Sequence, residues 1–279
     1  MKRKITKKIG TLFTAFSLAA TSLLSPVPVM AAGTEDVYVM TELSTTVLLD
    51  SESKSFDVPT TSFAYTKKGL LKTCNTPWSA TTYTYTGKKL AKTVDIPTER
   101  TNEDVKTVNT YSYSDDGLTG TYKTKSVYED GDGLDSTTTL TYDKKGRLKK
   151  LTLIYDETPD EKYITTYTYN SKGQLTKETS NQNHWVRTFT YNKKGYIKKS
   201  VATYDDSEGA TSGFTYDYTY TYDKNGNVKK KVERIDYVDE TMPDSTNTTT
   251  YKYKKLTVKK SLTEVIDSQQ WKLLYEEYL

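Results

Sequence analysis

The stretch YTYNSKGQL (Tyr167–Leu175) decides the expected fold, because almost every position in it has a structural reason. Tyr167 and Tyr169 are two residues apart, so their side chains point to the same face of a β-strand. Asn170 can accept hydrogen bonds from the backbone that follows it and so open a type I turn. Gly173 supplies the positive φ that closes the loop in hairpins with a Gly bulge. Leu175 then starts a return strand, so the stretch predicts one β-hairpin.

The same frame recurs along the chain, which predicts a protein built from repeated hairpins. Only 34% of the residues are hydrophobic, and the 25 Tyr far outnumber the 6 Phe and 3 Trp. We therefore expect an all-β fold, an antiparallel meander of repeated β-hairpins forming an extended twisted or curled sheet. The other copies are FAYTKKGLL (Phe63–Leu71), YSYSDDGLT (Tyr111–Thr119), LTYDKKGRL (Leu140–Leu148), FTYNKKGYI (Phe189–Ile197) and YTYDKNGNV (Tyr220–Val228), with the degenerate YTYTGKKLA (Tyr83–Ala91) and YKYKKLTV (Tyr251–Val258).

Two of these blocks, YDKKGRL and YDKNGNV, resemble the YD repeats of bacterial Rhs-type secreted proteins. The resemblance covers residues 63–258 and implies hairpins that build a sheet or wind into a hollow shell. Residues 259–279 are too few for the toxin domain that large Rhs proteins carry. The resemblance therefore implies a short member of this class, without a toxin domain and with a bare sheet.

The N-terminus has the three parts of a secretory signal. Five basic residues among the first eight precede an apolar run over residues 12–24, and a Pro-containing stretch follows it. Val29 and Ala31 have the spacing of a signal-peptidase site, which predicts residues 1–31 as the signal peptide and Ala32 as the mature N-terminus. The apolar run is shorter than the roughly 20 residues that span a bilayer. We expect a secreted or cell-surface protein with no integral membrane segment after cleavage.

Removal of the signal changes the charge balance. The full chain has 40 Lys plus Arg and 36 Asp plus Glu, and the five basic residues of the signal leave 35 against 36, a net charge of −1. A chain with this balance is not expected to bind nucleic acid.

Charge is nevertheless distributed unevenly between two kinds of turn. The turns that contain Gly carry lysines, among them Lys144, Lys145, Lys193 and Lys194, whereas the loops between hairpins are acidic. Alternate turns of a meander lie on opposite edges of the sheet, so one edge should be basic. Such an edge either contacts an anionic polymer or is simply solvated.

The strand FTYDYTYTYD (Phe214–Asp223) alternates strictly and places four tyrosines on one face. Aromatic faces can stack on sugar rings, and tyrosine hydroxyls tolerate water. We expect this face to be partly exposed. The candidate ligand contacts are the four tyrosines, the four lysines named above, and a His–Trp pair in the loop NQNHWV: Tyr216, Tyr218, Tyr220, Tyr222, Lys144, Lys145, Lys193, Lys194, His184 and Trp185.

The residue inventory argues against catalysis and against a metal or cofactor. The chain has one His, His184, and one Cys, Cys74, which cannot supply a zinc ligand cluster. A single Cys cannot form an internal disulfide, so Cys74 is expected as a free thiol or an intermolecular link. The segment Glu129–Asp135 has only a weak likeness to a calcium loop, since Leu134 stands where an oxygen ligand is needed.

The division of the chain follows from these patterns. After the signal come lead-in strands over residues 32–62, the repeats over 63–258 and a C-terminal helical cap over 259–279. The predicted function is an exported, non-enzymatic protein for surface interaction, with a glycan, a wall polymer or another surface protein as partner. The alternative is a secreted hydrolase or toxin-associated component with a carboxylate site on the sheet.

Overall fold

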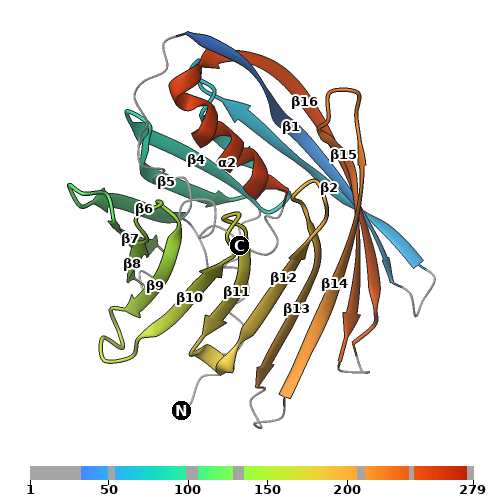
Figure 1. Ribbon diagram of the computed structural model, residues 1–279. Coiled ribbons are helices and arrows are strands. Elements are labelled where there is room, and N and C mark those ends of the chain that lie inside the picture. Colours follow the sequence, from blue (N-terminus) through green and yellow to red (C-terminus); the bar gives the residue numbers. More distant parts are fainter. Residues whose placement is uncertain are drawn as a thin grey trace.

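The computed structural model describes residues 33–49, 54–98, 106–127, 135–205, 211–238 and 242–274. The described residues form sixteen strands, and each strand pairs antiparallel with its neighbours in sequence order to make a closed barrel (Figure 1). One α-helix follows the last strand and lies across one end of the barrel (Figure 1). The predicted signal peptide and its cleavage site after Ala31 lie outside the described residues.

The strands fall into hairpins joined by short turns at one end and by longer loops at the other. Their bounds are β1 (Thr34–Leu49), β2 (Lys54–Tyr65), β3 (Leu71–Asn75), β4 (Ser79–Thr86), β5 (Lys89–Pro97), β6 (Lys106–Tyr113), β7 (Thr119–Val127), β8 (Ser136–Tyr142), β9 (Leu148–Tyr155), β10 (Tyr163–Tyr169), β11 (Leu175–Ser180), β12 (Val186–Tyr191), β13 (Ile197–Asp205), β14 (Thr211–Tyr222), β15 (Val228–Tyr237) and β16 (Ser245–Lys259), with the 3₁₀ helices η1 (Gln182–His184) and η2 (Lys260–Leu262) and the α-helix α2 (Thr263–Leu273).

The turn chemistry predicted from the repeats is confirmed. In the β10–β11 turn, Asn170 Oδ1 accepts hydrogen bonds from the backbone N–H groups of Lys172 and Gln174, both at 3.0 Å. Gly173 has φ +82°, and the register between the two strands shifts at Tyr169, as a bulge requires. Asp143, Asn192 and Asp223 make the same pair of backbone contacts in their own turns.

The expectation of an open twisted or curled sheet is wrong, because β1 pairs with β16 along nearly its whole length and closes the sheet. The pairing runs from Thr34 opposite Lys259 to Leu49 opposite Ser245. A free edge would leave a row of unpaired backbone groups, and closure removes both edges at once. Residues 34–49, which appear in the sequence as a lead-in, thus form the strand that completes the barrel.

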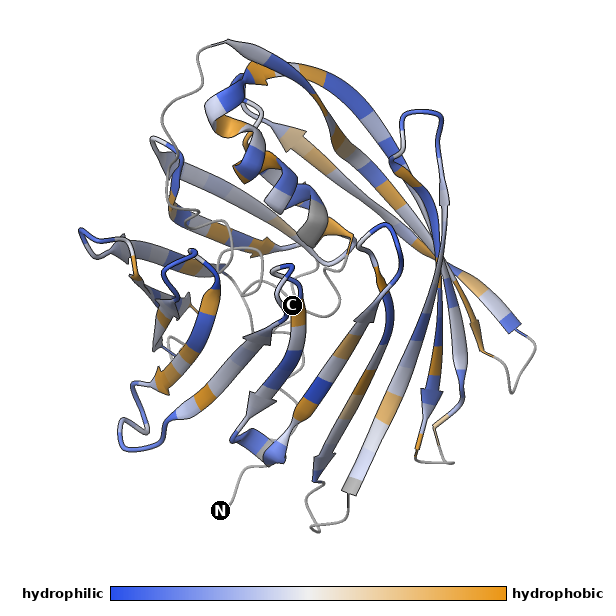
Figure 2. Cartoon of the chain, in the orientation of Figure 1, coloured by the Kyte–Doolittle hydropathy of each residue, from blue (hydrophilic) through white to orange (hydrophobic). Residues whose placement is uncertain are grey.

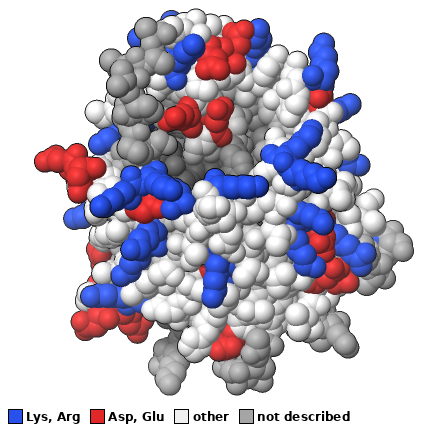
Figure 3. All heavy atoms as spheres, viewed as in Figure 1, with Lys and Arg blue, Asp and Glu red and all other residues white. Residues whose placement is uncertain are grey.

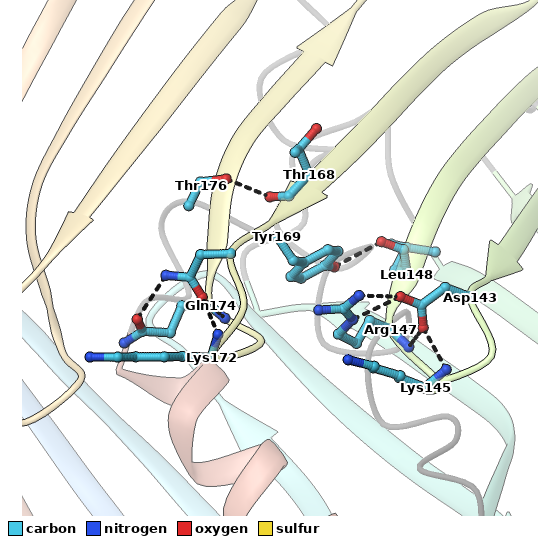
Figure 4. Close-up of polar contacts among 10 residues, drawn as sticks. Asp143, Lys145, Arg147, Leu148, Thr168, Tyr169, Lys172, Gln174 and Thr176 are labelled. Atoms are coloured by element: carbon cyan, nitrogen blue, oxygen red, sulfur yellow. Dashed lines mark hydrogen bonds and ion pairs between the residues drawn. The ribbon is translucent and has the colours of Figure 1, made fainter.

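Tyrosine hydroxyls connect successive hairpins. Tyr169 Oη donates to the carbonyl oxygen of Leu148 (2.8 Å), which begins the return strand of the preceding hairpin (Figure 4). This contact explains why the repeat uses Tyr where Phe would pack equally well, since Phe has no donor. Equivalent bonds run from Tyr113 to Leu90, Tyr191 to Leu175, Tyr220 to Ile197 and Tyr253 to Val228.

The barrel wall has an apolar inner face and a polar outer face. On β14 the buried Tyr216 and Tyr218 alternate with Thr215, Asp217 and Thr219. Colouring by hydropathy shows hydrophobic and hydrophilic residues as bands along several of the strands (Figure 2). Leu, Phe and Tyr side chains from many strands meet inside, so the interior holds the hydrophobic core.

Helix α2 is fixed to the end of the barrel that carries the short turns. Gln269 accepts a hydrogen bond from the backbone N–H of Leu71 (3.1 Å) and donates one to the Tyr85 hydroxyl (3.0 Å). Ile266 is fully buried against Val39 and Val258. The helix is therefore held at this end by both polar and apolar contacts. The part of the predicted cap beyond residue 274 lies outside the described residues.

In the part of the chain that the structure describes, no helix has the length and apolar character needed to cross a membrane.

Candidate binding site at the lysine rim

The short hairpin turns bring the predicted lysines to one end of the barrel. Strands alternate in direction, so every turn that contains a positive-φ Gly lies at the end covered by α2. Figure 3 shows a hollow on this face with Lys and Arg side chains along part of its edge and Asp and Glu side chains along another part. We call the exposed lysines of these turns the lysine rim; they are Lys67, Lys68, Lys144, Lys145, Lys172, Lys193, Lys194 and Lys224.

Tyrosines extend the lysine rim inward at the β12–β13 and β14–β15 hairpins. Lys194 Nζ lies 3.5 Å from the centroid of the Tyr222 ring, a cation–π contact. The ring of Tyr196 lies 5.3 Å from that of Tyr220 and 5.5 Å from that of Tyr222. The structure thus brings together four residues that the sequence nominated as ligand contacts, Tyr220, Tyr222, Lys193 and Lys194, and adds Tyr196.

Asp143, beside Lys144 and Lys145, does not cancel their charge, because its carboxylate is paired with Arg147 in the same turn. Asp143 accepts a hydrogen bond from Arg147 Nε (2.7 Å) and pairs with the same guanidinium at 2.6 Å, as Figure 4 shows. Burial alone would raise the pKa of Asp143, but the hydrogen bonds from Arg147 and the turn backbone outweigh it and hold the pKa below its ordinary value. Lys144 and Lys145 therefore keep their positive charge free for a ligand.

Two of the nominated tyrosines are not available at a surface. Tyr216 and Tyr218 are 8% and 4% exposed and face the barrel interior. Their rings stack, with centroids 6.1 Å apart. The expected partly exposed face therefore exists only near the turn, where Tyr220 and Tyr222 retain some contact with solvent.

His184 and Trp185 lie at the other end of the barrel, between β11 and β12. His184 has a side-chain exposure of 82%, and its Nδ1 lies 2.7 Å from Asp205 Oδ2. Trp185 turns inward and makes an edge contact with Phe214, with ring centroids 6.5 Å apart. The pair thus cannot share a ligand with the lysine rim.

Charged residues inside the barrel were missed by the sequence reasoning. Arg187 is 1% exposed, and its guanidinium donates to Ser200 (3.1 Å) and lies over the Phe189 ring. Lys231 and Glu233 are 3% and 0% exposed and pair at 3.6 Å. The sequence RTFTY contained a clue to this, because Arg187 and Phe189 are two residues apart and so point to the same face of the strand, which is the inner one.

Glu178 is the second acid that faces the interior, opposite Arg187 in the β11–β12 register. Burial raises its pKa to about 7, against the opposing effect of the Arg187 charge. Each inward acid thus lies beside a base, Glu178 beside Arg187 and Glu233 beside Lys231. The hydrolase alternative requires two acids that converge on a substrate, whereas Glu233 is in an ion pair with Lys231 and Glu178 lies opposite Arg187 in the strand register.

The geometry of the described residues supports neither a metal site nor an accessible thiol. Among the described residues, no three His, Cys, Asp or Glu side chains gather where they could hold a metal ion. The weak calcium-like segment lies almost entirely in residues 128–134, which are outside the described part. Cys74 is 3% exposed and sits in the hydrophobic core, so a thiol of a second chain could reach it only after local opening.

The sequence matches no protein-family model and no curated protein. A porin-like protein from Bacteroides uniformis ATCC 8492 has a similar structure, with a TM-score of 0.50, 16% identity, and coverage of 77% of this chain and 96% of that one. A porin-like protein from Bacteroides vulgatus ATCC 8482 gives a TM-score of 0.41 at 14% identity, covering 78% and 99%. A TcdB2-TccC3-Cdc42 structure gives 0.27 at 13% identity, covering 68% and 13%.

At 16% identity the first likeness concerns the fold alone, and the other two scores are too low to support an argument. The interpretation of the chain as a YD-repeat, Rhs-like repeat protein is not supported. The barrel closes within this single chain, and a porin-like protein is among the structures that it resembles. The repeated motif encodes a hairpin, and hairpins of this kind occur in many β architectures.

Proposed function

We propose that this protein is an exported, non-enzymatic binding protein of the cell surface that holds an anionic polymer at the lysine rim. One observation carries the proposal: exposed lysines from successive hairpins converge on one end of the barrel, where they line part of the edge of a hollow (Figure 3). Clusters of one sign around a concave surface concentrate the electric field there and attract ions of the opposite sign.

The spacing of the lysines suits a polymer. Each hairpin contributes two strands, and neighbouring strands are roughly 4.8 Å apart, so equivalent turns recur about every 10 Å around the end of the barrel. A chain with regularly spaced phosphates or carboxylates can engage several turns together, which multiplies weak contacts. Tyr196 and Tyr222 beside Lys194 add aromatic surface on which a sugar ring of such a polymer can stack.

The outer face of the barrel is polar, which supports a location in water at the cell surface. Lys199 on β13 pairs with Asp217 on β14 at 3.5 Å, and Thr215 and Thr219 flank Asp217 at outward positions. A barrel embedded in lipid carries an apolar band about 25 Å tall on its outside. The porin-like fold nevertheless suggests an outer-membrane location as the alternative, and fractionation of the native protein with and without detergent separates the two.

The experiment compares two double variants of the mature chain from Ala32 that lose equal charge. Lys193→Gln with Lys194→Gln removes charge from the lysine rim, and Lys123→Gln with Lys125→Gln removes it from the outer face of β7. Binding to a glycerol-phosphate polymer should weaken about tenfold in the first variant only. It should also weaken as salt rises past about 0.15 M, where the Debye length is roughly 8 Å.

Binding that ignores both salt and the first double variant would contradict the proposal. A neutral glucan serves as the control probe. If it binds as well as the polyanion, stacking on tyrosine rather than charge holds the ligand.

A further inference from the structure

The carboxyl end of helix α2 lies against the inner wall of the barrel. Lys231 on β15 is 3% exposed, and its Nζ donates a hydrogen bond to the carbonyl oxygen of Leu274 (3.1 Å). Leu273 and Leu274 are 1% and 7% exposed. They belong to the same core cluster as Tyr218 on β14 and Tyr251 on β16. The helix therefore covers part of the wall that would otherwise face the interior.

The wall beneath the helix carries charge, and the barrel is wide. Lys231 and Glu233 pair at 3.6 Å, although each is almost fully buried. Burying such a pair costs desolvation that its attraction does not always recover, and that cost falls if water can reach the pair. Inward side chains fill a barrel of about eight strands, whereas porins of roughly sixteen to eighteen strands enclose a channel. With sixteen strands, this barrel has room for solutes beside the helix.

Two adjacent glutamines join the helix to irregular points of the wall. Gln270 Oε1 accepts a hydrogen bond from the backbone N–H of Met40, where the β1–β16 register shifts. Gln269 Oε1 accepts one from the backbone N–H of Leu71 (3.1 Å), where the β2–β3 register shifts. Water can replace a glutamine at such an N–H with little net change in free energy. These bonds therefore position the helix more than they hold it.

The amino-terminal half of the helix carries charge that disfavours docking. Partial burial raises the pKa of Asp267, and the nearby carboxylates of Glu35 on β1 and Glu264 raise it further. At neutral pH the ionised Asp267 is therefore less favourable in the docked helix than it would be in water.

We propose that α2 is a movable cover, which undocks as a unit from the inner wall while the sixteen strands stay paired. Undocking admits water and small solutes to the wall around Lys231 and Glu233. The strand ladder does not hold the helix, because the pair that closes the barrel ends at Lys259 and the helix begins at Thr263. Local opening of this kind costs less free energy than global unfolding. The inference does not rest on the proposed function, because it makes no use of the lysine rim.

The single cysteine of the chain reports this opening. Cys74 is 3% exposed and shares a core cluster with Leu273 and Leu274. The experiment measures how fast iodoacetamide alkylates Cys74 in the mature chain from Ala32 under native conditions. Labelling should be at least about tenfold faster than the global unfolding equilibrium, measured in urea, allows. Hydrogen exchange should show the amides of α2 exchanging together, ahead of those of β1 and β16.

Two Leu→Ala variants separate the cover from the wall. Leu273 on α2 and Leu140 on β8 are 1% and 0% exposed and lie in different core clusters. Leu273→Ala should speed labelling by about tenfold or more, with little change in the urea midpoint of the β-sheet signal. Leu140→Ala is the matched control: it should lower that midpoint and speed labelling only as far as the lost global stability accounts for. Lys193→Gln with Lys194→Gln should label as the parent does.

Four outcomes would overturn the inference. Labelling of the parent could be no faster than global unfolding allows, or it could proceed at the rate of an exposed thiol, which would mean that the docked helix covers nothing. The two Leu→Ala variants could speed labelling equally for the stability that each loses. Loss of the folded barrel in Leu273→Ala, seen by circular dichroism, would show that the strands depend on the helix.

Discussion

Two turn glycines with the same backbone conformation but different surroundings allow backbone strain to be separated from packing. Gly173 has φ +82° and Gly69 has φ +83°. A Cβ added at Gly173 meets no atom within 4 Å, whereas one at Gly69 lies 2.7 Å from Val258 Cγ1 and 2.9 Å from Ile266 Cδ1. We therefore compare Gly173→Ala with Gly69→Ala.

The expected magnitudes follow from these distances. A left-handed backbone costs an alanine roughly 1–2 kcal/mol, partly offset by the lower entropy of its unfolded chain, so Gly173→Ala should lose about 1 kcal/mol. Gly69→Ala has the same backbone cost and must also displace two packed side chains, which adds about 1–3 kcal/mol. Ile266 belongs to α2, so this second variant should also loosen the helix from the barrel.

The assay is urea unfolding followed by circular dichroism, with hydrogen exchange to report local opening of α2. Gly173→Val should be worse than Gly173→Ala, because a β-branched residue is the least tolerated at positive φ. Lys172→Val is the control for side-chain change in the same turn and should have a small effect. Equal losses for Gly69→Ala and Gly173→Ala would refute the packing of α2 on the β2–β3 turn.

Three further predictions concern single side chains. Tyr169→Phe removes the hydroxyl bond to Leu148 and should cost about 1 kcal/mol in thermal unfolding, whereas Tyr222→Phe should be nearly neutral. The pKa of Glu178 is about 7 in the fold, above its ordinary 4.5, so its contribution to stability is present below about pH 4.5 and is lost as pH rises through 7. Glu178→Gln should therefore flatten the pH profile and stabilise the protein at pH 8 by roughly 1–2 kcal/mol, since the side chain keeps some solvent contact; an unchanged slope would contradict this. The pKa of Asp143 is lowered in the fold, so the parent should lose stability as pH falls below about 4. The Asp143→Asn variant should not show this loss.

Local features were readable from the sequence because they depend on neighbours within a few residues. The Asx contacts of Asn170 and the positive φ of Gly173 occur where the repeat placed them. The alternation of FTYDYTYTYD likewise set which side chains share a face. The alternation could not say which of the two faces would be buried, and the inward face took Tyr216 and Tyr218 out of solvent.

The candidate site was only partly foreseeable. The basic character of the turns was visible, and the alternation of strand direction places them at one end in an open meander as well as in a barrel. The contact between Lys194 and Tyr222 was not visible, because it joins two hairpins and depends on their register. Arg187, Lys231 and Glu233 were missed because a charged residue in a strand is normally assigned to the solvent side.

The sequence by itself therefore determined the hairpin and its turn residues, since these arise from local backbone preferences, and the segregation of charge between the two kinds of turn, which is written in their composition. The tertiary structure decided closure, the contents of the interior and the docking of α2. The physical reason is the long range of the deciding contact. β1 and β16 pair residues more than 190 positions apart. Local backbone preferences carry no information about which distant strand pairs with a free edge. Once that pair forms, the curvature, the inside and the two ends of the barrel are fixed together.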